Sequence, residues 1–104
     1  MYYSILIQTN LSLSLPEQYP LSILPISPEV SINDRSILWE GQVVTFDVLI
    51  TDEPKTLEVL WDGPKVVTNH NFETSIEGVY VIGPLVKSTL SIQEQLNRIL
   101  DALL

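Results

Sequence analysis

The apolar residues at the start of the chain predict two strands of different kinds. Residues 2–9 are rich in aromatic and β-branched side chains, which favour extended backbone. At their centre, residues 5–7 form an unbroken apolar run, so we expect a central strand that is covered on both faces. Residues 11–15 instead alternate leucine with serine, and this period of two predicts a half-buried strand that ends before Pro16.

Prolines dominate the next segment, residues 16–28. Each of its four prolines fixes its own φ angle and restricts the conformation of the residue before it. Only short extended pieces, such as residues 21–24, fit between these prolines. We therefore expect this segment to be an ordered but irregular crossing or a sheet edge.

Alternating apolar and polar residues over 36–83 predict an antiparallel meander. Residues 36–39 and 42–51 form the first expected hairpin, and Gly41 supplies the positive φ that a tight turn requires. Successive side chains of a strand point to opposite faces, so the second strand of this hairpin has two distinct sides. The side expected to join the core carries Val44, Phe46, Val48 and Ile50. The other side carries Val43, Thr45, Asp47 and Leu49.

Turns rich in Asp, Asn, Gly and Pro divide the rest of this region into short strands. The turns are expected at residues 52–55, 62–64 and 69–71. The strands expected between and after them cover residues 56–61, 65–68, 72–76 and 78–82. Gly78 is either a turn residue between the last two strands or a bulge within one long strand.

The last apolar pattern has a helical period. Ser91, with Glu94 three residues later, matches a capping box and predicts a helix over residues 91–104. This helix packs on the sheet of its own chain or, as the alternative, on a partner chain. Its apolar stripe consists of Ile92, Leu96, Ile99, Leu100 and Leu103, and Leu104 lies outside the stripe.

Together these elements predict one β-rich α+β domain over residues 1–104. We expect an antiparallel meander sheet, or a partly open barrel, of about five to seven strands with one C-terminal amphipathic helix. The expected divisions are N-terminal strands over 1–15, a Pro-rich crossing over 16–35, the meander over 36–83 and the helix over 91–104.

Composition narrows the classes of partner. Thirteen Asp and Glu against five Lys and Arg give a formal net charge of -8, the wrong sign for a surface that neutralises phosphates. We therefore expect no direct nucleic-acid binding, although an inhibitor that mimics nucleic acid is an alternative. The sequence has no cysteine, which excludes thiolate chemistry and is compatible with a cytoplasmic location. We expect no signal peptide and no membrane association, since no apolar run reaches the roughly 20 residues of a membrane span.

Patterns that carry catalysis are scarce. The glycines are too far apart to form a phosphate-binding loop. His70 is the only histidine; Asp62 or Glu73 would orient it in a catalytic set, and Asp47, Asp62 or Glu73 would join it in a weak metal site. We favour an exposed, solvated imidazole, because His70 lies between two asparagines in an expected turn. We accordingly expect no enzymatic activity, no cofactor and no metal.

These observations favour a non-enzymatic, acidic protein–protein interaction module that acts by presenting a surface, such as an adaptor, an accessory subunit or a small inhibitor. The expected partner is a protein with a basic surface, or a second copy of the chain in a homo-oligomer. The interface candidates are Ile92, Leu96, Ile99, Leu100, Leu103, Leu104, Trp39 and Trp61. The alternative is a small-molecule-binding, barrel-like domain with a pocket lined by Phe46, Trp61 and Tyr80.

Overall fold

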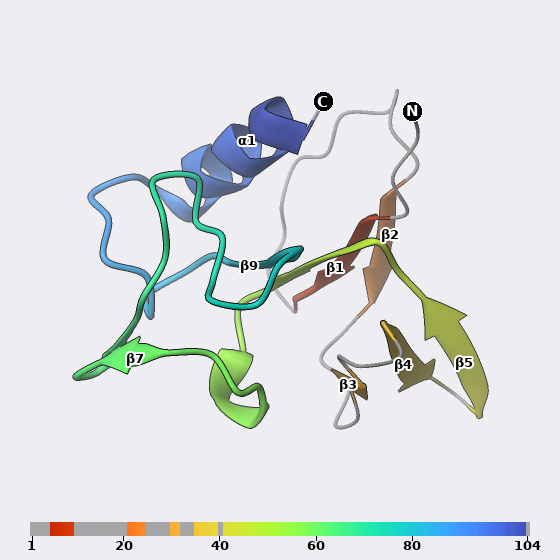
Figure 1. Cartoon of the computed structure of the whole chain (residues 1–104). Coiled ribbons are helices and arrows are strands. Elements are labelled where there is room, and N and C mark those ends of the chain that lie inside the picture. Colours follow the sequence, from red (N-terminus) through yellow and green to blue (C-terminus); the bar gives the residue numbers. More distant parts are fainter. Residues whose placement is uncertain (1–4, 10–20, 25–29, 32–34, 40, 104) are drawn as a thin grey trace.

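A computed structural model of the chain describes residues 5–9, 21–24, 30–31, 35–39 and 41–103 (Figure 1). The predicted strand over residues 11–15 lies outside these residues. The first six strands are β1 (Ile5–Gln8), β2 (Leu21–Leu24), β3 (Val30–Ser31), β4 (Ser36–Trp39), β5 (Gln42–Thr45) and β6 (Val48–Thr51). A 3₁₀ turn η1 (Pro54–Thr56) follows, then β7 (Trp61–Asp62), β8 (Lys65–Val66), β9 (Val79–Val81) and the helix α1 (Ile92–Leu103).

The largest sheet of the described residues is parallel. Its strand order is β2-β1-β6-β9, and all three neighbouring pairs run in the same direction. The predicted antiparallel meander, or partly open barrel, is therefore wrong, and no described strand closes the sheet into a barrel. The physical reason is visible in the burial pattern, because strands that are covered on both faces suit a parallel sheet better than a half-exposed meander.

Burial is complete along the inner strands of this sheet. All four residues of β1 and of β6, and all three of β9, are buried. The prediction that residues 5–7 are covered on both faces of a central strand is confirmed, since Ile5, Leu6 and Ile7 are at most 1% exposed. The core of the molecule thus lies on both sides of β1 and β6.

A smaller antiparallel ribbon, with strand order β3-β4-β5, precedes β6. The predicted first hairpin is confirmed, because β4 pairs with β5 and Gly41 between them has a φ of 78°. The single strand predicted over 42–51 is wrong: it divides at Phe46 and Asp47, where the chain leaves the ribbon and enters the parallel sheet. Leu49, which was expected on the outer side, is fully buried because β6 is covered on both faces.

The side chain of Arg35 holds this division in place. Its guanidinium donates to the backbone oxygens of Asp47 and Glu77, each at 3.0 Å. The Arg35 backbone oxygen accepts a 2.9 Å hydrogen bond from the amide of Phe46. One residue therefore ties the end of the ribbon to the turn that leads into β9. Gly78, in that turn, has a φ of 80°, so it is a turn residue rather than a bulge.

The segment between β6 and β9 contains less strand than its sequence predicts. The strand predicted over 56–61 is wrong, because η1 occupies its start and only its last residue is extended in β7. The turn predicted at 62–64 is confirmed, since β7 and β8 form an antiparallel hairpin around Gly63. The strand predicted over 72–76 reduces to one antiparallel bridge, between Glu73 and Tyr80. The connection that returns the chain to the parallel sheet is therefore a hairpin and loops.

The predicted C-terminal helix is confirmed over Ile92–Leu103. The hydroxyl of Ser91 accepts a 3.2 Å hydrogen bond from the amide of Glu94, as expected for an N-cap residue. Leu96, Ile99 and Leu100 are buried in the same core as the strands of the parallel sheet. In the view of Figure 1, α1 and the antiparallel ribbon lie on opposite sides of β1. Within the described residues, no helix has the length and apolar character needed to span a lipid bilayer.

Candidate functional site

Polar side chains gather at two places, and the first is the carboxyl edge of the parallel sheet. In the strand order β2-β1-β6-β9, β2 lies on one side of β1, and the later strands β6 and β9 lie on its other side. The order in which strands are added therefore reverses between β1 and β6, although all four strands run parallel. In open parallel sheets, ligands bind beyond the carboxyl ends of the strands at such a reversal. Here β1 ends at Gln8 and is followed by Thr9, and β6 ends at Thr51 and is followed by Asp52. This edge therefore holds the side chains that the fold would use first for chemistry.

These four side chains form two hydrogen-bonded pairs, Gln8 with Thr51 and Thr9 with Asp52. The hydroxyl of Thr51 donates to Oε1 of Gln8 at 3.1 Å and accepts from the amide of Glu53 at 3.0 Å. The hydroxyl of Thr9 donates to Oδ2 of Asp52 at 2.7 Å. Gln8, Thr9 and Thr51 are at most 4% exposed. Their hydrogen bonds join β1 to β6 and leave little polar surface open to a ligand.

Gln95 of α1 closes the same edge from the side of β9. Its Oε1 accepts a 2.8 Å hydrogen bond from the amide of Gly83, and its Nε2 donates to the backbone oxygen of Leu90 at 3.1 Å. Gln95 is 3% exposed, so both bonds are made away from water. Within the described part of the chain, Oδ1 of Asp52 is the one buried side-chain oxygen without a hydrogen-bond partner. Apart from this oxygen, the described polar side chains at the edge bond within the protein, so the edge serves mainly to join β1, β6 and α1.

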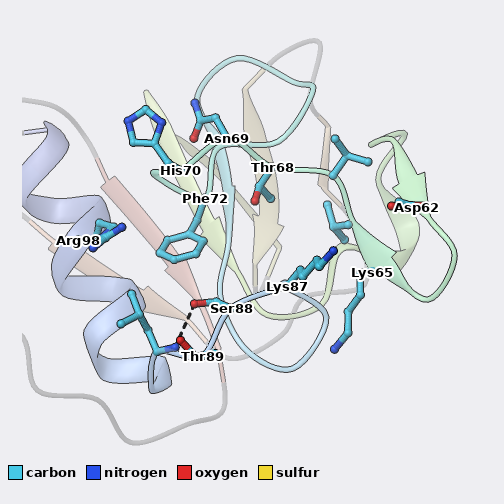
Figure 2. A pocket seen from close by; sticks show the side chains of 13 residues that line it. Asp62, Lys65, Thr68, Asn69, His70, Phe72, Lys87, Ser88, Thr89 and Arg98 are labelled. Atoms are coloured by element: carbon cyan, nitrogen blue, oxygen red, sulfur yellow. Dashed lines mark hydrogen bonds between the residues drawn. The ribbon is translucent and has the colours of Figure 1, made fainter.

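The second place is an open pocket between β8, the loop around residues 68–72, the loop of residues 87–90 that precedes α1, and Arg98 in the middle of α1 (Figure 2). Its volume is about 850 Å³. Pockets of this size accommodate ligands as large as a drug molecule or a short peptide segment. The pocket is lined by Asp62, Lys65, Val66, Val67, Thr68, Asn69, His70, Phe72, Lys87, Ser88, Thr89, Leu90 and Arg98.

Basic side chains are concentrated in this pocket. Lys65, Lys87 and Arg98 are three of the five Lys and Arg residues of the chain, and the only histidine, His70, joins them. Of the thirteen Asp and Glu residues, Asp62 alone lines the pocket. The pocket therefore has a positive local balance in a chain whose net charge is strongly negative.

Most of these basic groups are free to meet a ligand. The ammonium of Lys65 donates to the backbone oxygen of Pro84. Among the described residues, the side chains of Lys87, His70 and Arg98 have no hydrogen-bond or ion-pair partner. His70 is exposed, as expected for its turn. The pocket thus offers two cations, Lys87 and Arg98, whose charges are not neutralised by any residue that the structure describes.

The wall that carries His70 is built around a strained aromatic residue. Phe72 is 5% exposed and has a φ of 68°, a left-handed conformation that costs about 1–2 kcal/mol outside glycine. The turn before it is fixed by Asn69, whose Oδ1 accepts from the amides of Asn71 and Glu73 at 2.9 and 3.1 Å. The amide of Val81 donates to the Phe72 oxygen at 3.1 Å, which anchors this wall to β9.

Exposed apolar side chains lie beside the pocket on the β7–β8 hairpin. Leu60 is 62% exposed, Trp61 38% and Val67 43%. The amide of Val67 donates to the Leu60 oxygen at 2.9 Å, so these two residues are held next to each other. Val67 also lines the pocket. We call Leu60, Trp61 and Val67 the hairpin patch. Val67 connects it to the basic pocket, whereas Leu60 and Trp61 do not line the pocket. Trp61 pairs with Val66, so it belongs to the opposite face of the hairpin from Leu60 and Val67.

The residues that the sequence proposed as interface candidates are dispersed. Leu96, Ile99 and Leu100 are buried inside the chain, while Ile92 and Leu103 are partly buried against the same core. Trp61 is on the surface in the hairpin patch. The side chain of Trp39, and Leu104, lie outside what the structure describes.

The other sequence-derived sites are not brought together either. Phe46 and Tyr80 are buried core residues at 3% and 8% exposure, and neither lines the basic pocket. Glu73 accepts a 3.0 Å hydrogen bond from the amide of Gly78. Across the described ranges, no three His, Asp or Glu side chains are close enough to hold a metal ion.

Sequence reasoning missed the basic pocket because its residues come from distant parts of the chain. Lys65 follows a turn, Lys87 lies in a loop and Arg98 is on the polar side of α1. The available signal was that three of the five basic residues lie after position 60 in a chain dominated by acidic residues. No protein-family model matches the chain, and comparison with curated proteins and with solved structures gave no match.

Proposed function

We propose that this chain is a non-enzymatic protein-interaction module that binds its partner through the hairpin patch and the adjoining basic pocket. The observation that carries the proposal is that Val67 belongs to both features. An exposed apolar side chain therefore adjoins basic side chains that have no partner among the described residues. A surface that combines a tryptophan with basic groups has the composition of an interaction hot spot.

The rigidity of the hairpin supports this role. Trp61 pairs with Val66 across the hairpin, and the amide of Val66 donates to the Leu85 oxygen at 2.9 Å. The patch is therefore held against the loop that precedes α1. Binding of a partner to the patch therefore costs this protein little conformational entropy.

The edge at the carboxyl ends of the parallel strands supports a binding role for this protein over a catalytic role. Its polar groups are engaged in joining strands, as the bond between Thr51 and Gln8 illustrates. The acidic residues outside the pocket give the rest of the surface a negative field, which favours partners whose surrounding surface is basic and raises their association rate. We place the interaction in the cytoplasm, with which a chain without cysteine is compatible.

The proposal is tested by quantitative co-purification from the native host with three tagged forms: wild type, Trp61→Ala and Val43→Ala. Val43 is the matched control, because it is 69% exposed and lies on β5, outside the hairpin patch. We expect at least about a tenfold loss of the specific partner with Trp61→Ala, and recovery equal to wild type with Val43→Ala. Equal recovery with all three forms would contradict the proposal.

A further inference from the structure

We infer that the basic pocket binds an acidic peptide segment of the partner, an extended stretch of chain that carries several Asp or Glu carboxylates. This inference rests on the proposed function and specifies the part of the partner that enters the pocket. Lysine and arginine form charge-assisted hydrogen bonds with carboxylates, which are stronger than bonds between neutral groups.

The first step of the argument is the contrast between local and global charge. Three basic residues and one acidic residue line the pocket, whereas the whole chain carries a net charge of -8. If the charged residues of this chain were distributed at random over its surface, the pocket would be lined mainly by acidic residues. The fold instead collects Lys65, Lys87 and Arg98 from three separate segments into one cavity. A negatively charged ligand would find few other favourable places on this molecule.

The second step concerns the shape of the ligand. In Figure 2, Arg98 lies on α1 at one side of the view, whereas Lys65 and Lys87 lie at the other side, near the β7–β8 hairpin. The Lys and Arg side chains are therefore spread across the pocket and do not converge on one point. A single small anion reaches only some of these groups. An extended peptide presents successive same-face side chains about 6–7 Å apart, so its carboxylates can meet several of the basic groups.

The third step assigns different weights to the basic residues. Glu94 and Asp101 line a second cavity together with Arg98, so acidic groups accompany Arg98 along α1. Lys65 already donates to the backbone oxygen of Pro84. Lys87 is exposed, and its ammonium has no hydrogen bond or ion pair with a described residue, although Asp62 also lines the pocket. We therefore expect Lys87 to contribute most to binding.

The test is a titration of the protein with a hexaglutamate peptide. Binding is monitored by tryptophan fluorescence and by the chemical shifts of the backbone amides. Hexaglutamine, which has the same length and no charge, is the control ligand. Lys55→Gln is the control variant, because Lys55 is an exposed lysine on η1 that does not line the pocket. Removing one exposed cation weakens an ion pair by about 0.2–1 kcal/mol. We therefore expect Lys87→Gln to bind hexaglutamate about 1.4- to fivefold more weakly than wild type, and Lys55→Gln to bind like wild type.

Three results would overturn the inference. The first is that hexaglutamine binds as tightly as hexaglutamate. The second is that Lys55→Gln and Lys87→Gln weaken binding equally, which would show that binding depends on the net charge of the protein and not on the pocket. The third is tighter binding of a single-stranded oligonucleotide with the same number of charges, which would identify a nucleic acid as the ligand. Shifts of amides that line the pocket, with the double variant Lys65→Gln, Lys87→Gln about tenfold weaker than wild type, would support it.

The outcome is distinguishable from the fate of the proposed function. If hexaglutamate fails to bind while Trp61→Ala still loses the partner, the hairpin patch is the interface and the acidic-peptide inference is wrong. If hexaglutamate binds in the pocket while Trp61→Ala retains the partner in full, the pocket binds anions and the proposed interaction surface is wrong.

Discussion

The carboxyl edge of the parallel sheet and the basic pocket are both assembled from polar side chains, but the fold uses them in opposite ways. At the sheet edge, Gln8, Thr51 and Gln95 are almost fully buried and their hydrogen bonds are made within the protein. At the pocket, Lys87 and Arg98 are exposed and have no partner among the described residues.

The difference shows that polar composition alone does not identify a binding site. A buried polar group that has a partner contributes to stability, because leaving it unpaired would cost about 1–3 kcal/mol. An exposed cation without a partner contributes almost nothing to folding and remains available to a ligand. Substitutions should therefore separate the two regions by the property that they change.

The largest expected effect is on the sheet itself. Ile50→Ala should lower the free energy of unfolding by about 2–5 kcal/mol, because Ile50 is fully buried and its truncation leaves a cavity. Val43→Ala, at a position that is 69% exposed, should change it by less than about 0.5 kcal/mol. Urea denaturation measures both. Similar losses at the two positions would show that the parallel sheet is not the stable part of the molecule.

The next effect concerns the turn before β9. A Cβ atom on Gly78 would lie 2.6 Å from Nη1 of Arg35 and 3.1 Å from the backbone oxygen of Asp47, at a φ of 80°. Gly78→Ala should therefore destabilise the fold by about 2–3 kcal/mol, from backbone strain and displacement of the guanidinium. Gly41→Ala is the matched control, because Gly41 has a similar φ of 78° and a Cβ atom there would meet nothing within 4 Å.

Thermal and urea unfolding of these two glycine variants separate the cost of the left-handed backbone from the cost of the clash between the new Cβ atom and Arg35. Gly41→Ala should cost only the strain of the left-handed backbone, about 1–2 kcal/mol. In an Arg35→Ala background, Gly78→Ala should become milder but stay costlier than Gly41→Ala, because the 3.1 Å contact with the backbone oxygen of Asp47 remains. An unchanged cost in that background would refute the role of Arg35.

A smaller effect on the free energy of unfolding is expected at the carboxyl edge of the parallel sheet. Gln95→Met preserves the length of the side chain but removes its bonds to Gly83 and Leu90, and should cost about 2 kcal/mol. Asn97→Met, on the exposed side of the same helix, should cost less than about 0.5 kcal/mol. Urea denaturation compares the two, and hydrogen exchange of the Gly83 amide should accelerate only in Gln95→Met. A protected Gly83 amide in that variant would mean that another group closes the edge.

The smallest expected effect is at the pocket. Lys87→Gln should change the free energy of unfolding by less than about 0.5 kcal/mol, because its ammonium is exposed and unpaired among the described residues. Thermal unfolding at equal protein concentration provides the measurement. A loss as large as that of Gln95→Met would assign Lys87 to the fold and remove the distinction between the two regions.

Local features of the fold were predictable from sequence where the signal itself is local. The apolar run at residues 5–7 indicated a strand covered on both faces, and Ser91 marked the start of the helix. Gly41 marked a tight turn that the structure confirms. Each of these features depends on neighbouring residues, whose patterning and backbone preferences are visible in a short window.

Pairing between distant strands was not predictable in the same way. The antiparallel meander was predicted from alternating residues and turn residues, which indicate short strands but do not determine which strands pair or in which direction. The structure uses an antiparallel ribbon and a hairpin as the connections between parallel strands. The division at Phe46 and Asp47 was missed because the alternation of apolar residues continues through it. The basic pocket was missed because a net charge averages over the whole surface.

The distance along the chain between the two inner strands has a consequence for biosynthesis. Gln8 and Thr51, which bond side by side in the finished sheet, are separated by 43 residues. At a translation rate of about 5–20 residues per second, β1 leaves the ribosome roughly two to nine seconds before β6 can cover it. During that interval its isoleucines and leucine have no native partner on the β6 side, so this strand is the segment that a nascent-chain chaperone would be expected to hold.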